Sequence, residues 1–92
     1  MKQRENLLER MTSAVDLDTE PIPKLPLVEL AGHKRALIEN HSGVTQYSMH
    51  EICVKVRFGQ IRIQGNRLML SRMTKEQLII IGEIESVSLC RE

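Results

Sequence analysis

Apolar and polar residues alternate across positions 52–63, and this pattern favours β structure over helix. Successive side chains of a β-strand point to opposite faces, so a period of two places one set in a core and the other in water. Glycines at positions 59, 65 and 82 interrupt the apolar runs and are expected to mark turns. The expected buried set is Ile52, Val54, Val56, Phe58, Ile61 and Ile63. The pattern alone indicates a small β domain, without indicating its function.

The rest of the chain extends this pattern into a single domain. A chain of 92 residues supports one core at most, and that core is only marginally stable, so a partner or oligomerisation would add to its stability. About eight short strands, with turns roughly every 6–10 residues, are typical of a sandwich, a roll or a small barrel. We predict a mainly β domain at residues 27–92, folded as a compact two-sheet sandwich or roll. The strands are expected near residues 27–30, 34–40, 44–48, 52–58, 60–64, 67–72, 78–81 and 84–89.

Two different segments precede this domain. Residues 1–15 are predicted to form a short amphipathic helix, which is marginal in water unless it docks on another surface. It either packs on its own sheet, frays, or docks on a partner or a membrane; the membrane is less favoured because Glu5 and Glu9 offset its basic residues. Residues 16–26 contain all three prolines and are predicted to form an extended linker. The apolar face of the helix, our candidate docking surface, consists of Leu7, Leu8, Met11 and Val15.

Composition limits the compartment and the partners. The formal net charge of +1 argues against a bulk electrostatic binder of nucleic acid. Two cysteines without a secretory signal do not make a disulfide framework, which favours a reducing compartment. No apolar run approaches the roughly 20 residues of a membrane-spanning helix. We therefore expect a cytoplasmic protein without a transmembrane segment.

Residues that could perform catalysis or bind a metal are present but not grouped. The three histidines and two cysteines lack metal-ligand spacing, and no paired carboxylates, phosphate-binding glycine loop or nucleophile elbow appears. Cys53 falls on the polar phase of its strand, where we expect it to be exposed, and His50 is close in sequence. A lone strand cysteine is more often inert. The sequence therefore predicts no enzyme activity, no metal site and no cofactor.

Charge is distributed unevenly along the β domain. Residues 52–75 contain six basic residues and no acid, whereas residues 76–92 contain four acids and one arginine. The basic stretch is either a solvated face whose charges discourage strand aggregation, or a contact surface for an acidic partner, another copy's acidic end or anionic lipid. Nucleic acid is the least favoured ligand because Phe58, the aromatic residue in this stretch, lies on the buried phase. The predicted basic face comprises Lys55, Arg57, Arg62, Arg67 and Arg72.

The segment from Leu78 to Ile81 is apolar on both phases of a strand. Such a strand is either central and covered on both sides, or one of its faces is an interface. The linker and helix of this chain are one possible cover, and a second copy of the chain is the other.

Several short motifs in the β domain resemble the YabP/YqfC family of sporulation proteins, and especially its YqfC branch. They lie at residues 38–43, 59–65 and 76–84, with Leu25-Pro26 leading into the first strand, so that the resemblance covers about residues 25–90. The motif at residues 38–43 forms a corner, with Gly43 as the residue expected at positive φ. The residues of this corner that carry the resemblance are Ile38, Glu39, Asn40, His41 and Gly43.

The resemblance implies a role in spore development, in the mother cell of an endospore-forming bacterium, without a known catalytic activity. It favours a structural role for the Asn40–His41 corner, since an Asn side chain can bond its own backbone there. We therefore expect an assembly or adaptor protein that acts through self-association, through a partner such as an integral membrane protein, or both. Peripheral attachment at the membrane around the forespore is the expected location. The alternative is a small ligand- or nucleic-acid-binding β-barrel domain.

Overall fold

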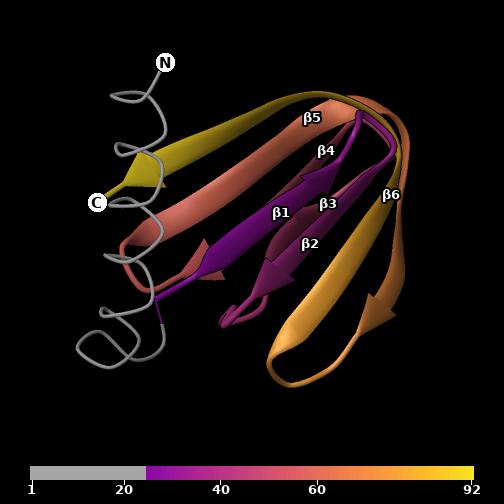
Figure 1. Ribbon diagram of the computed structural model, residues 1–92. Coiled ribbons are helices and arrows are strands. Elements are labelled where there is room, and N and C mark those ends of the chain that lie inside the picture. The colour runs from indigo at the N-terminus through magenta and orange to yellow at the C-terminus, as the bar shows by residue number, and fades with distance from the viewer. Residues whose placement is uncertain (1–24) are drawn as a thin grey trace, which may run out of the picture.

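The computed structural model describes residues 25–92, which form one antiparallel sheet of six strands in the order β1-β2-β6-β5-β4-β3 (Figure 1). The predicted helix at residues 1–15 and most of the linker lie outside the described residues. Mainly β structure is therefore confirmed for the domain. The strands are β1 (Leu27–Ala31), β2 (Arg35–Glu39), β3 (Val44–Tyr47), β4 (Glu51–Val56), β5 (Gly59–Met73) and β6 (Gln77–Arg91).

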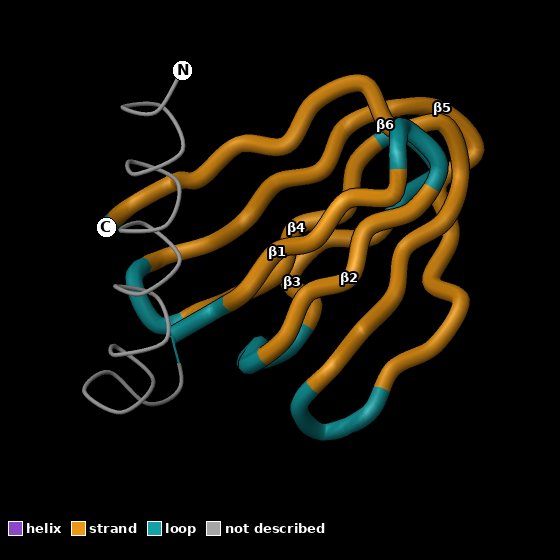
Figure 2. The backbone as a smooth tube through the Cα atoms, in the orientation of Figure 1, coloured by secondary structure: helices purple, strands orange, loops and turns teal. Residues whose placement is uncertain are grey.

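The prediction of about eight strands in two sheets is not confirmed, because two pairs of expected strands are continuous. Residues 60–64 and 67–72 belong to the single strand β5, and residues 78–81 and 84–89 belong to β6. Figure 2 shows both strands continuing through a bend. The pairing between them shifts register at the bend, as expected where bulges increase strand curvature.

Close approach of the two strands explains the glycines at the bend. A Cβ atom built on Gly65 would lie 2.0 Å from the carbonyl oxygen of Glu83. A Cβ atom built on Gly82 would lie 2.5 Å from the carbonyl oxygen of Arg67, and Gly82 has φ +134°, a region that favours glycine. Gly65 and Gly82 therefore bend the β5–β6 hairpin instead of ending its strands.

The bend divides the sheet into two halves that share one core. Core residues alternate with outward-facing ones along β4 and along the first part of β5, so the alternation read from the sequence correctly identifies the inner face of these segments. Beyond them, the register shifts at the bend change which alternate residues of β5 and β6 face the core. Half-sheet A contains β1, β2, residues 77–81 of β6 and residues 69–73 of β5; half-sheet B contains β3, β4, residues 59–64 of β5 and 86–91 of β6. The buried cluster comprises Ala36, Ile38, Ile52, Val54, Val56, Ile61, Ile63, Leu68, Leu78, Ile80 and Ile84.

Candidate interaction surfaces

The corner between β2 and β3 joins three separate segments of the chain. Asn40 has φ 63°, a left-handed conformation that asparagine adopts more readily than most residues. Its backbone N–H donates to the carbonyl oxygen of Glu76 at 2.6 Å. Its side-chain Nδ2 donates to the carbonyl oxygen of Leu25 at 2.9 Å, rather than bonding its own backbone as expected. Asn40 thus ties the end of β2 to the β5–β6 turn and to the segment before β1.

His41 adds a second link between the same corner and the β5–β6 turn. The backbone N–H of Gly43, which has φ 120°, donates to Nδ1 of the imidazole at 3.0 Å. Because Nδ1 accepts, the other ring nitrogen carries the proton, and Nε2 donates to the carbonyl oxygen of Thr74 at 2.9 Å. Both ring nitrogens of His41 are therefore used in hydrogen bonds to the backbone. The positive φ predicted for Gly43 is confirmed.

Replacing His41 by leucine should lower the free energy of unfolding by about 1–3 kcal/mol, because two hydrogen bonds are lost. Urea denaturation followed by circular dichroism measures this difference. Ser42→Ala is the matched control: its side chain is exposed and adjacent, and we expect a change of less than about 0.5 kcal/mol. Equal losses in the two variants would contradict the role given to the imidazole.

A polar hollow of about 430 Å³ lies beside this corner. It combines two cationic side chains with one carboxylate, and one of the cations, Arg57, belongs to the predicted basic face. Both ring nitrogens of His41 are already bonded to the backbone. The hollow is lined by Asn40, His41, Ser42, Arg57, Lys75 and Glu76.

The other members of the predicted basic face are distributed around the bend. Lys55 and Arg62 lie on the outer face of half-sheet B, on neighbouring strands. Arg62 is paired with an acid, since its Nε lies 3.4 Å from Oε2 of Glu51, a residue outside the basic stretch. Arg67 lies at the bend, with φ 56°, and Arg72 lies beyond it on half-sheet A. The structure thus brings Lys55 and Arg62 together and separates them from Arg67 and Arg72.

Cys53 occupies the outer face of β4 as its phase predicts, yet it is buried, with 2% of its surface exposed. The expectation that it is exposed was wrong because polar neighbours cover it. Its Sγ lies 3.4 Å from Oε2 of Glu51 and 3.8 Å from Oε1 of Gln46. Burial raises the pKa of the Cys53 thiol, although a hydrogen bond from Arg62 opposes the rise. A buried thiol with a raised pKa is a poor nucleophile.

An apolar surface lies on the outer face of half-sheet A. The inward residues of β6, Leu78 and Ile80, are fully buried, whereas Ile79 and Ile81 point outward and are half-buried. Within residues 25–92, each strand contacts only its neighbours in the sheet order and the two half-sheets face each other through the core, so no strand packs on this outer face. The sequence singled out the two-sided apolar segment of β6 but not its neighbours on other strands. We call this the outer apolar surface; it comprises Leu27, Leu37, Met69, Ile79 and Ile81.

Two further features bear on the kind of site. Within residues 25–92, no group of three or more His, Cys, Asp or Glu side chains is placed to hold a metal ion. Nor does this part of the chain contain a helix that could span a membrane.

These features define a small antiparallel β protein whose candidate sites are open surfaces on a bent sheet. The chain belongs to the YabP family, whose model matches residues 24–92. It is also 27% identical over 88 residues to the uncharacterised protein YqfC of Bacillus subtilis (strain 168), an alignment that covers 95% of each chain. Neither the family's description nor this relative's name assigns an enzyme activity. No solved structure matches the chain significantly.

Proposed function

We propose that this protein is a non-enzymatic assembly or adaptor module of sporulation that acts through protein–protein contacts. The observation that carries the proposal is the outer apolar surface, where Ile79 and Ile81 stay half-exposed while the adjacent Ile80 is fully buried. Apolar residues gathered on a surface favour a macromolecular partner. Membership of the YabP family supports the link to spore development.

The proposed mechanism uses two parts of the chain. Residues 1–15 act as a docking peptide through Leu7, Leu8, Met11 and Val15, and the sheet provides a surface for self-association or for a second partner. The linker prolines keep the two parts separate. The proposed location is the mother cell, at the membrane around the forespore, where an integral membrane protein would hold the chain.

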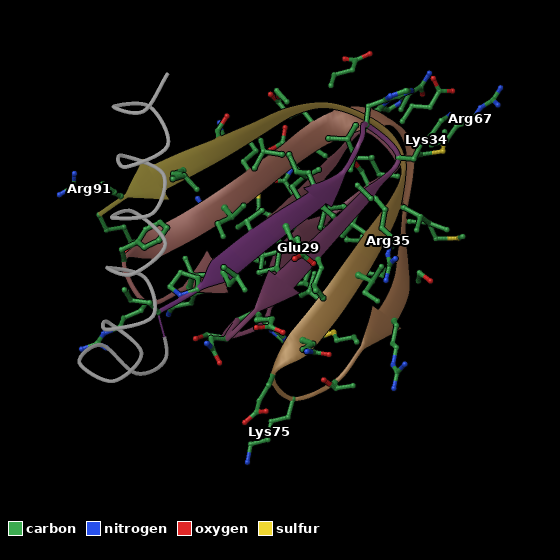
Figure 3. All side chains as sticks on the ribbon, viewed as in Figure 1. Glu29, Lys34, Arg35, Arg67, Lys75 and Arg91 are labelled. Atoms are coloured by element: carbon green, nitrogen blue, oxygen red, sulfur yellow. The ribbon has the colours of Figure 1, made fainter. Side chains whose placement is uncertain are left out.

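Deleting residues 1–20 and, separately, reversing Arg57, Arg62 and Arg67 to glutamate should each reduce the number of heat-resistant spores. The first change removes the docking peptide, and the second turns the basic side chains into repulsive ones for an acidic partner. Spore counts in the organism that carries the protein measure the effect. Reversing Arg91, which is exposed and lies away from the bend where Arg67 lies (Figure 3), is the control for charge reversal.

Normal spore counts in both variants, with the chain still folded and present at its usual level, would defeat the proposed function. Circular dichroism of the purified variants separates a lost contact from a lost fold. A drop in the Arg91 control equal to that in the arginine variant would show that the change in net charge, and not the position of the three arginines, is responsible.

The alternative function, a ligand- or nucleic-acid-binding barrel, is favoured by the hollow at the corner, whose lining includes Arg57 and Lys75. The interior argues against it, because it is filled by side chains that include five fully buried isoleucines. The single tyrosine and single phenylalanine of the chain also provide no stacking platform. A salt-sensitive shift of labelled single-stranded nucleic acid would favour this alternative.

A further inference from the structure

We propose that the outer apolar surface is a twofold contact between two copies of this chain. This inference rests on the proposed function and names the partner for one of its two surfaces. The order of residues across half-sheet A and a hollow on the same face both fit this contact.

Cross-strand pairing places four residues in one row across the outer face. Glu29 on β1 pairs with Leu37 on β2, Leu37 pairs with Ile79 on β6, and Ile79 pairs with Arg72 on β5. Neighbouring strands are about 4.8 Å apart, so the row is roughly 14 Å long. An acid lies at one end, a base at the other, and two branched apolar side chains lie between them.

This order is complementary to itself. Consider a second copy facing the first, related by a twofold axis that runs parallel to the strands midway between β2 and β6. The rotation places β1 opposite β5 of the other copy and β2 opposite β6. Leu37 then faces Ile79 of the second copy, and Glu29 faces Arg72. Because each pair occurs twice, two apolar pairs are flanked by two ion pairs.

A hollow on the same face provides a second fit. It has a volume of about 300 Å³, and the neighbouring row runs from Ala31 on β1 through Arg35 and Ile81 to Met69 on β5. The same rotation brings Met69 of the second copy opposite Ala31. Met69 is 50% exposed, and its flexible thioether suits an irregular gap. The hollow is lined by Glu29, Leu30, Ala31, Arg35 and Leu37.

The placement of charge on the rest of the molecule agrees with this contact. Figure 3 shows Glu29 and Arg35 on the same side of the sheet, whereas Lys34 and Arg67 lie at the bend and Lys75 lies at the β5–β6 turn. The basic side chains at the bend and the turn therefore lie outside the row from Glu29 to Arg72. Arg35, by contrast, lies inside the neighbouring row, where the rotation places it opposite Ile81 of the second copy. In a twofold contact, the acid at one end of the row meets the base at the other end, so the row supplies both partners of each ion pair. This self-complementarity is why a second copy, and not residues 1–15, is the occupant proposed.

The test uses the full chain and exchanges the charges at the two ends of the row. Glu29→Arg and Arg72→Glu each replace two attractive pairs by two repulsive ones, so each variant should dimerise at least about tenfold more weakly than the wild type. The double variant restores opposite charges and should return to within about threefold of the wild-type dissociation constant. Light scattering after size exclusion gives the species, and sedimentation equilibrium gives the constant. Lys34→Glu, a reversal away from the surface, should leave the constant unchanged.

Three results would overturn the twofold contact. The first is a wild-type chain that is monomeric at all accessible concentrations, and the second is a dimer that survives both single exchanges unchanged. The third is a chain that dimerises only after residues 1–20 are deleted, which would assign the surface to the chain's own N-terminal segment. A monomer whose spore counts still depend on residues 1–20 and on Arg57, Arg62 and Arg67 would refute this contact and leave the proposed function standing.

Discussion

Gly65→Ala is expected to lower the free energy of unfolding by about 3 kcal/mol or more, because the new methyl group would collide with backbone rather than with a movable side chain. The carbonyl oxygen of Glu83 lies 2.0 Å from the position of that Cβ atom. To make room, β5 and β6 would have to separate at the bend that lets both half-sheets share one core. Urea denaturation followed by circular dichroism measures the loss.

Gly32→Ala is the control for Gly65→Ala. Gly32 lies in the β1–β2 turn with φ +57°, and nothing lies within 4 Å of its Cβ position. Gly32→Ala should therefore lower the free energy of unfolding only by the cost of placing a non-glycine residue in the left-handed region, about 1–2 kcal/mol. An equal loss of unfolding free energy in the two variants would mean that the bend relaxes around the new methyl group. The close approach of β5 and β6 would then not be the reason for glycine at position 65.

Ile80→Ala and Ile79→Ala are expected to separate the two faces of β6. Ile80 is fully buried, so its truncation leaves a cavity and should lower the free energy of unfolding by about 2–5 kcal/mol. Ile79, one position earlier, points outward. Ile79→Ala should therefore lower the free energy of unfolding by less than about 1 kcal/mol when the chain is dilute enough to be monomeric. At higher concentration, Ile79→Ala should weaken dimerisation. Sedimentation and denaturation of both variants provide the comparison.

A loss at Ile79 as large as that at Ile80 in dilute solution would contradict this division. It would mean that the outer face is covered within a single chain. The adjacent positions carry the same residue type and the same backbone state, so composition and strand propensity cannot account for a difference between them.

The inner face of the sheet could be predicted from the sequence because alternate residues of one strand point into the core. Ile52, Val54 and Val56 are buried as their phase predicts. The bend was missed because a glycine that ends a strand and a glycine that lets two strands approach look the same in one sequence. The difference lies in the partner strand, where Glu83 supplies the carbonyl oxygen next to Gly65.

The candidate sites could be predicted only in part, because they depend on how separate strands pair. Two apolar phases in Leu78–Ile81 indicated an interface or a second cover, and the structure places Ile79 and Ile81 on an open face. Glu29 and Arg72 share a row only through the pairing of four strands, which local pattern does not encode. Cys53 was expected in water because phase predicts a face, whereas its exposure depends on Gln46 and Glu51.

The pairing of β2 with β6 also determines when the fold can be completed during synthesis. Ile38 pairs with Leu78, so a strand made early must wait for one near the end of the chain. Half-sheet A cannot close until residues 77–81 have left the ribosome, and until then Ile38 has no strand of its own chain to complete its side of the core. Pairing across such a separation carries a loop-closure cost and is slow compared with forming a hairpin. Half-sheet B has the same dependence, because β5 pairs along its length with β6, so both halves of the molecule are completed only after β6 has been made.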